Sequence, residues 1–286
     1  MPLALITGAS TGIGRATTLR LTAAGWTVLA GVRDAGAGER LRQDAAGAGQ
    51  VIPLTLDITD AEQIAGAAAE VQRHSAVDGQ HPPAGLDALV NNAGMGIGGP
   101  LELISTEDLR MQMEVNVIAQ VAVTQAMLPA LRQARGRIVF ISSVGGRVST
   151  PYLAPYAASK HALEAIGDAL RIELRSSNVQ VALVEPGSVT TPIWDKSRAQ
   201  ARAVSIPPQL AAQYGHVPAA MEKAIEDTAR RGIPPERVAE TIAGALSASR
   251  MKSRYVVGRD AKGMLILRSL LPDLVFDRLM RRVLGV

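Results

Sequence analysis

Short apolar runs alternate with segments of helical periodicity along most of the chain. Such runs are typical of strands that are buried on both faces of a parallel sheet. The segments between them carry apolar residues at helical spacing, as helices that connect parallel strands do. The pattern predicts an α/β, Rossmann-like fold, a doubly wound parallel seven-stranded sheet in a single domain. The expected strands are residues 3–6, 26–32, 51–56, 86–90, 136–141, 179–184 and 255–257.

Helices are expected between these strands and after them. Right-handed crossovers then place the carboxyl ends of all the strands at one edge of the sheet, where ligands bind in such folds. The residues that directly follow the strands are therefore the first candidates for a site. The expected helices are residues 15–24, 36–49, 61–74, 102–131, a segment that starts near 156, and 234–249.

The C-terminal part has a weaker pattern. Residues 193–231, which include Trp194, predict an irregular and partly helical insertion, and we expect a substrate lid at about 188–231. Residues 259–286 are amphipathic, and Pro272 should divide them into two helices. We therefore expect a catalytic domain at 1–258 and a helical extension at 259–286. The extension could cover the substrate site, pair with another subunit or, less expectedly, lie on a membrane surface.

Composition excludes several kinds of site. Hydrophobic residues make up 47% of the 286 residues, enough for a folded core. The chain has no cysteine, so disulfides, thiolate metal sites and a cysteine nucleophile are excluded. Its four histidines lie far apart in the sequence and predict no metal site.

Charge and hydropathy limit the partners. The net charge is +4, but the basic residues are spread and aromatic residues are only 3%, which argues against nucleic-acid binding. The first residues lack the basic segment of a signal peptide. No uninterrupted apolar run reaches the roughly 18–20 residues of a membrane span. We expect a cytoplasmic protein without a transmembrane segment.

A glycine-rich turn follows the first expected strand. Residues 7–14 read Thr-Gly-Ala-Ser-Thr-Gly-Ile-Gly and precede a helical segment. Glycines let a backbone approach a pyrophosphate, and a helix N-terminus offers free N–H groups and partial positive charge. The spacing Gly8, Gly12, Gly14 differs from the standard dinucleotide fingerprint, and a turn without a ligand is the alternative.

Arg33 and Asp34 follow the second expected strand, where such folds meet the adenosine ribose. An acidic residue there binds ribose hydroxyls, whereas an arginine pairs with a 2′-phosphate. Because Arg33 comes first, NADP(H) is favoured over NAD(H). The alternative is that both side chains only face solvent. Asp57, after the third strand, is placed near an adenine.

Tyr156 and Lys160 lie one turn apart on an expected helix and so share a face. A phenol with a pKa of about 10 is a poor base, but a nearby ammonium favours the phenolate. The pair could therefore donate and accept a proton, although a solvated pair without a role is the common alternative. Ser143 follows the fifth strand, at the same predicted edge. Asn116 lies in an apolar helix and needs partners, either at a helix kink or in a site.

Together these motifs resemble the short-chain dehydrogenase/reductase family in its single-domain form. The resemblance covers residues 3 to about 257 and rests on the glycine turn, Asn91-Asn-Ala-Gly94, Asn116, Ser143, Tyr156-x-x-x-Lys160 and Pro186-Gly187. It implies an enzyme that moves a hydride between a nicotinamide and a carbonyl or secondary alcohol. The family often has a basic residue at the position of Thr11, so the expectation of NADP(H) depends on Arg33.

The resemblance also implies roles for individual residues. Tyr156 is the general acid/base, Lys160 lowers its pKa and binds the nicotinamide ribose, Ser143 binds the substrate oxygen, and Asn116 holds a water that links Lys160 to solvent. The implied cofactor-binding residues are Gly8, Ser10, Thr11, Gly12, Ile13, Gly14, Arg33, Asp57, Ile58, Asn92, Ala93, Gly94, Tyr156, Lys160, Pro186, Gly187, Val189 and Thr191.

The apolar extension and the Ala30–Arg33 stretch are similar to the hydroxysteroid and retinol dehydrogenase branch of the family, which implies a bulky apolar substrate. One alternative is a ketoreductase of aliphatic or acyl-chain ketones. Another is an NADP(H)-binding regulator without turnover. The family usually forms homodimers or homotetramers, through helix faces around Asn116 and Tyr156.

Overall fold

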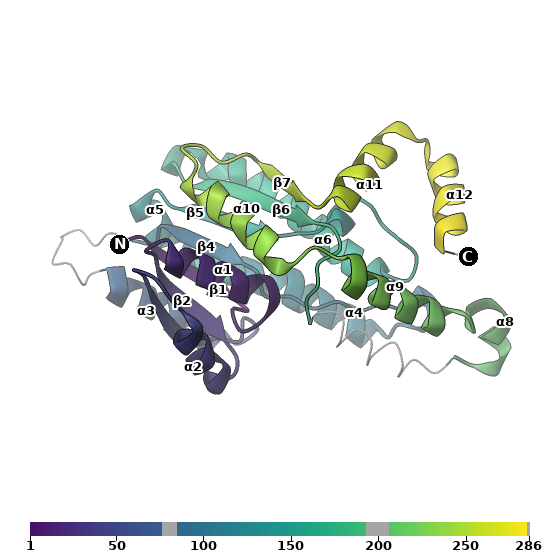
Figure 1. Ribbon diagram of the computed structural model, residues 1–286, viewed down its shortest axis with the longest axis horizontal. Coiled ribbons are helices and arrows are strands. Elements are labelled where there is room, and N and C mark those ends of the chain that lie inside the picture. Colours follow the sequence, from purple (N-terminus) through teal and green to yellow (C-terminus); the bar gives the residue numbers. More distant parts are fainter. Residues whose placement is uncertain (76–84, 193–205, 285–286) are drawn as a thin grey trace.

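A single parallel sheet forms the centre of the molecule (Figure 1). The computed structural model describes residues 1–75, 85–192 and 206–284. Its strand order is β3-β2-β1-β4-β5-β6-β7, and all the pairings between these strands are parallel. The order reverses between β1 and β4, as in doubly wound folds, so the predicted fold class is confirmed. The strands are β1 (Leu3–Thr7), β2 (Thr27–Val32), β3 (Gln50–Thr55), β4 (Ala88–Asn91), β5 (Arg137–Ile141), β6 (Gln180–Pro186) and β7 (Arg254–Val257).

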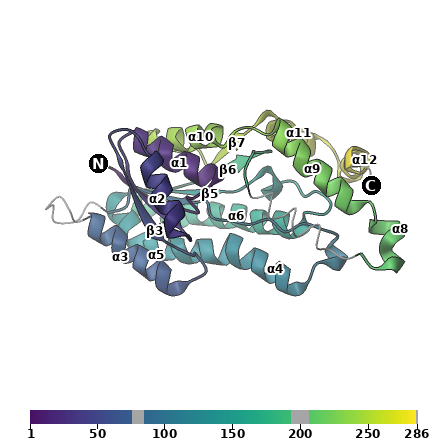
Figure 2. The same ribbon diagram turned by 60° about the horizontal axis from the view of Figure 1, so that its bottom comes forward.

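Helices cover both faces of the sheet (Figure 2). One face packs against α1 (Gly12–Ala23), α2 (Ala35–Asp44) and α10 (Pro235–Ser247), and the other against α3 (Ala61–Ser75), α5 (Ala119–Ala134) and α6 (Ala154–Glu173). Alternate residues of β1 enter the two cores, because successive side chains of a strand point to opposite faces. Ala4 and Ile6 join the α1/α10 core, and Leu3 and Leu5 join the α5/α6 core.

The expected helix at 102–131 differs from the structure. A 3-10 turn (Leu101–Leu103) precedes α4 (Thr106–Met113), and a π-helical turn (Glu114–Ile118) joins α4 to α5. Ser105 begins α4 by accepting a hydrogen bond from the Asp108 amide at 3.0 Å. The π turn contains Asn116, and such turns are frequent at functional sites.

Residues 106–134 form a continuous helical segment that is long and apolar enough to cross a membrane, a property that the sequence reading did not find. Its packing argues against a membrane span, because 44% of its most apolar 18-residue stretch is buried inside the protein. Val123, Met127 and Leu131 lie in the α5/α6 core. The segment therefore has the contacts of a core helix.

Within residues 206–284, the described C-terminal part, the regular elements are helices apart from β7. Residues 193–205 of the expected lid, with Trp194, lie outside the described residues. The described part contains a 3-10 turn (Pro208–Leu210), α8 (Ala211–Tyr214) and α9 (Val217–Arg231), a longer regular helix than the weak pattern indicated. α11 (Arg259–Leu270) follows β7 directly, and α12 (Asp273–Leu284) comes after Pro272. The predicted break of the extension into two helices is confirmed.

Candidate active site

A cleft of about 660 Å³ opens at the carboxyl ends of the strands. Its walls come from the segments that follow β1 to β6, as right-handed crossovers predict. Most of the predicted site residues line it, whereas Gly14 and Asn116 lie outside its lining. The predicted residues in the lining are Gly8, Ser10, Thr11, Gly12, Ile13, Arg33, Asp57, Ile58, Asn92, Ala93, Gly94, Ser143, Tyr156, Lys160, Pro186, Gly187, Val189 and Thr191.

The glycine turn has the geometry of a phosphate cradle. Gly8 and Gly12 have left-handed φ angles of +63° and +53°, which glycine adopts without strain. A Cβ on Gly12 would lie 3.1 Å from Thr191 Cγ2, on the opposite wall. Thr11 begins α1 in an extended conformation without capping it through its side chain, so the first amides of the helix stay available. These features fit the pyrophosphate of a dinucleotide.

Thr7, the first residue of the glycine motif, had no predicted role of its own, but it holds this turn against the next loop. Its Oγ1 accepts hydrogen bonds from the Asn92 and Ala93 amides, both at 3.0 Å. The side-chain amide of Asn92 donates to the Thr7 and Gly8 carbonyls at 2.8 and 3.0 Å. The predicted cofactor residue Asn92 therefore also positions the turn. A threonine at the end of a buried strand was the available signal for Thr7.

Gly14 packs closely against the glycine turn and Asn92. A Cβ on this residue would overlap the Gly8 carbonyl oxygen and lie 2.5 Å from Asn92 Nδ2. This glycine therefore allows α1 to approach the turn closely, and its expected contact with a pyrophosphate stays a prediction.

The side chains of Arg33 and Asp34 diverge. Arg33 lines the cleft. Asp34 caps α2, and its carboxylate accepts hydrogen bonds from the Gly36 and Ala37 amides at 2.9 and 3.2 Å. Asp57 accepts hydrogen bonds from the backbone and hydroxyl of Thr59, which lower its pKa together with the positive charge of Arg33. Of these two charged residues after β2, Arg33 is therefore the one that lines the cleft.

Tyr156, Ser143 and Lys160 are buried together at the other end. Tyr156 lies in the first turn of α6, one turn before Lys160. Ser143 Oγ accepts a hydrogen bond from the Gly145 amide at 3.0 Å and is also hydrogen-bonded to the Tyr156 hydroxyl. Lys160 Nζ donates to the Ile141 carbonyl at 2.7 Å. The solvated alternative for Tyr156 and Lys160 is wrong, because their exposed fractions are 9% and 5%.

The electrostatics of this trio differ from the simplest expectation. Burial raises the pKa of Tyr156, and the hydrogen bond with Ser143 only partly opposes this effect. The Lys160 ammonium lies 5.8 Å from the centre of the Tyr156 ring and is held at the Ile141 carbonyl. Burial also lowers the pKa of Lys160 to about 8, against the negative charge of Glu164. Desolvation therefore outweighs the expected lowering of the tyrosine pKa by the lysine.

Asn116 has a complete set of partners. Its Oδ1 accepts from the Met95 amide at 2.8 Å, and its Nδ2 donates to the Met95 carbonyl at 2.9 Å and to Ser159 Oγ at 3.0 Å. Ser159 in turn donates to the Tyr156 carbonyl at 2.7 Å. Asn116 thus ties the loop after β4 to α6, and its role in holding a water stays a prediction. Gln112, which the sequence reading missed, binds the same loop through Met95 and Ile97.

The loop after β6 is fixed by later elements. Asp260, at the start of α11, accepts a hydrogen bond from the Ser188 amide at 2.7 Å. Val189 forms an isolated parallel bridge with Ile233. The residues expected to meet the nicotinamide are therefore positioned by contacts from the C-terminal part, which no local motif indicated.

Comparisons with known proteins agree with this geometry. Residues 2–202 match the family model described as short chain dehydrogenase. The NADPH-dependent 3-dehydrocapnine reductase of Ornithobacterium rhinotracheale is 36% identical over 98% of this chain and 96% of its own length. Retinol dehydrogenase 5 of Mus musculus is 35% identical over 98% of this chain and 87% of its own length. A crystal structure of a short chain dehydrogenase/reductase from Burkholderia phymatum in complex with NAD has a TM-score of 0.77 and 26% identity, covering 94% and 92% of the two chains.

Proposed function

Because the chain belongs to the short-chain dehydrogenase/reductase family of NAD(P)-dependent oxidoreductases, we propose that it interconverts a bulky apolar ketone and its secondary alcohol with NADP(H). The main observation in support of this reaction is that Tyr156, Ser143 and Lys160 are buried in the wall of the cleft that the glycine turn also lines. An acid/base group, a hydrogen-bond donor and a cation therefore line the same cleft.

The protein residues handle the proton. The hydride would be supplied or accepted by a nicotinamide bound in the cleft. A substrate oxygen between the hydroxyls of Tyr156 and Ser143 accepts a hydrogen bond from each. Tyr156 gives its proton to that oxygen during reduction and takes it back during oxidation. With a pKa of about 8, Lys160 is mostly an ammonium at neutral pH, and its charge favours the phenolate that remains.

An apolar cluster that begins directly after Ser143, next to the cleft lining, supports the substrate class. Phe276 and Met280 of α12 are buried against Val148, and Val144, which directly follows Ser143, packs against the same cluster. Met264, Leu265, Leu267 and Leu271 complete it. The extension at 259–286 therefore serves as a cover on the substrate side. The name of the retinol dehydrogenase relative agrees with an apolar substrate.

The different positions of Arg33 and Asp34 after β2 support the preference for NADP(H). Asp34 is hydrogen-bonded to the N-terminus of α2, and Arg33 is left to meet a 2′-phosphate. The NADPH-dependent relative supports the same cofactor. Thr11 supplies no charge, so we assign the preference to Arg33.

Exposed apolar side chains support a homo-oligomer. Met111, Ile118 and Ile172 are 51%, 55% and 68% exposed and lie on or between α4 and α6. We propose that these helices meet a second copy, as dimeric or tetrameric assembly requires. Light scattering would report the assembly, and a monomer at micromolar concentration would contradict it.

The test of the reaction compares wild type with Tyr156→Phe on steroid, retinoid and aliphatic ketones. Wild type should reduce at least one bulky apolar ketone with NADPH. The variant should lose roughly 10²–10⁴-fold in kcat while NADPH affinity, measured by fluorescence, changes little. Turnover of small polar substrates alone would contradict the substrate class. An NADP(H)-binding regulator would show no turnover in either protein.

A further inference from the structure

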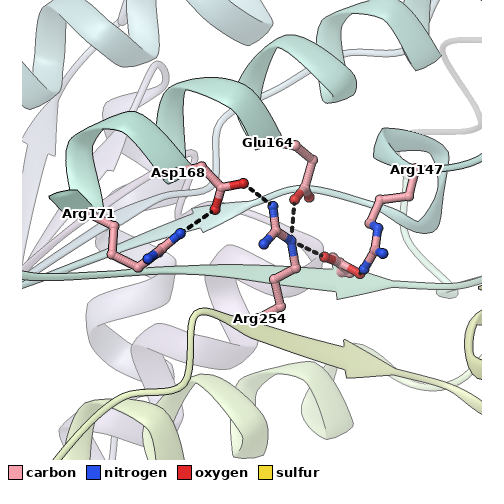
Figure 3. A network of polar contacts seen from close by, with 6 residues as sticks. Arg147, Glu164, Asp168, Arg171 and Arg254 are labelled. Atoms are coloured by element: carbon pink, nitrogen blue, oxygen red, sulfur yellow. Dashed lines mark hydrogen bonds and ion pairs between the residues drawn. The ribbon is translucent and has the colours of Figure 1, made fainter.

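A row of charged side chains crosses from the catalytic helix to the far edge of the sheet (Figure 3). Arg254 of β7 donates from Nε to Glu164 Oε2 at 2.9 Å and from Nη2 to Asp168 Oδ2 at 2.6 Å. The same Nε lies 3.1 Å from Glu185 Oε1. Both acceptors on α6 lie beyond Lys160, so the row begins one turn from the catalytic lysine.

Glu185 is the unusual member. It is fully buried on β6, directly before the cleft residues Pro186 and Gly187. Within the described residues, neither of its carboxylate oxygens receives a hydrogen bond from a donor, and Glu164 Oε1 receives none either. The two carboxyl groups are close enough to hydrogen-bond to each other, which requires one of them to carry a proton.

The surroundings favour that shared proton. Burial and the charge of Glu164 raise the pKa of Glu185, and Arg147 and Arg254 oppose them, so that the pKa is about 7. Arg147 reaches Glu185 only at 3.7 Å and is half exposed. Two carboxylates at such a distance do not both ionise readily, so the pair titrates as a unit.

Glu164 connects the pair to the active site. It lies four residues after Lys160 on α6, and its charge opposes the effect of burial on the lysine. Both side chains are buried, because the exposed fractions of Lys160 and Glu164 are 5% and 6%. Screening by water is therefore weak between these groups.

We propose that Glu164 and Glu185 share one proton and act as positioning residues for Lys160, with Glu164 as the counter-ion that keeps the lysine charged at the Ile141 carbonyl. This inference rests on the proposed function of Lys160. The other charged groups around the pair are Asp168 on α6, Arg147 after the Ser143 turn and Arg254 on β7. Asp260 of α11 is bound to the Ser188 amide.

The first test is the pH profile of kcat/KM for wild type, Glu164→Gln and Asp168→Asn. Without Glu164, burial of the Lys160 ammonium is unopposed, so the alkaline limb should move down by about one pH unit. Asp168→Asn removes another partner of Arg254, at the exposed end of the row. It should leave the pH of the alkaline limb unchanged. An unchanged profile in Glu164→Gln, or an equal shift in both variants, would overturn the proposal.

The second test does not depend on turnover or on the stability of Glu164→Gln. Carbon-13 NMR of glutamate-labelled protein should show one carboxyl that titrates near neutral pH in wild type and none in Glu185→Gln. A wild type without such a carboxyl, or its persistence in Glu185→Gln, would refute the shared proton. If wild type reduces no ketone, the proposed function fails, while this titration still decides whether the pair exists.

Discussion

The cofactor side and the substrate side of the cleft are held by different kinds of contact. On the cofactor side, the turn of Gly8, Gly12 and Gly14 is fixed by backbone approach and by the hydrogen bonds of Thr7 and Asn92. On the substrate side, α11 and α12 rest on an apolar cluster at the edge of the fold, and Leu270 and Leu274 are both 73% exposed. Substitutions on the first side should therefore affect every substrate, and those on the second only particular ones.

Gly14→Ala should have the largest effect. The added methyl would overlap the Gly8 carbonyl oxygen, so the turn must shift, and NADPH affinity should fall by roughly 100-fold or more. Isothermal titration with NADPH measures this loss. Gly263→Ala is the matched control, because nothing lies within 4 Å of its Cβ in α11. It should leave affinity unchanged and stabilise the helix by up to about 1 kcal/mol. Equal affinities of both variants would show that the cradle tolerates displacement.

The same division decides what can be predicted from sequence. The glycine turn, the positions of the strands along the chain and the Tyr156–Lys160 pair follow local rules of periodicity, backbone conformation and helical spacing, so they were foreseen. The π turn at Asn116 depends on its hydrogen bonds to the loop after β4. Glu164 and Arg254 lie 90 positions apart and meet only through the sheet. The raised pKa of Tyr156 likewise depends on burial, which spacing alone does not reveal.

Arg33→Ala tests whether Arg33 sets the preference for NADPH on the cofactor side. The loss of a charge-assisted contact with a 2′-phosphate should lower kcat/KM for NADPH by roughly 10–100-fold and leave NADH nearly unaffected. Arg40→Ala is the control, because Arg40 faces Asp34 at 3.6 Å on α2 and does not line the cleft. If the kcat/KM of wild type for NADH equals or exceeds that for NADPH, the assignment of the preference to Arg33 is wrong.

Glu185→Gln tests the stability that the buried acid pair contributes. The pKa of Glu185 in the folded protein is about 7, against an ordinary value of 4.5, so between these pH values the folded protein binds more protons than the unfolded protein. Wild-type stability should therefore fall as pH rises from about 5 to about 8, by on the order of 2 kcal/mol. Glu185→Gln should remove this slope in urea unfolding.

Asp168→Asn is the control for that slope. Hydrogen bonds from Arg254 and Arg171 lower the pKa of Asp168, so its carboxyl is ionised in both folded and unfolded protein over this range. The variant should lower stability by a nearly constant amount and keep the wild-type slope. A slope that persists in Glu185→Gln would assign the effect to other groups.

Phe276→Ala should have the smallest effect on catalysis and tests the substrate side. Phe276 is 5% exposed and belongs to the cluster that includes Val144, beside Ser143. Its truncation should loosen α12 and raise KM for a bulky apolar ketone roughly tenfold, about 1.4 kcal/mol, with little change in NADPH affinity. Leu274→Ala, on the exposed face of the same helix, should leave both constants unchanged. If Phe276→Ala weakened NADPH binding as much as it raised KM, the two sides of the cleft would be coupled, and a separate substrate cover would no longer describe α11 and α12.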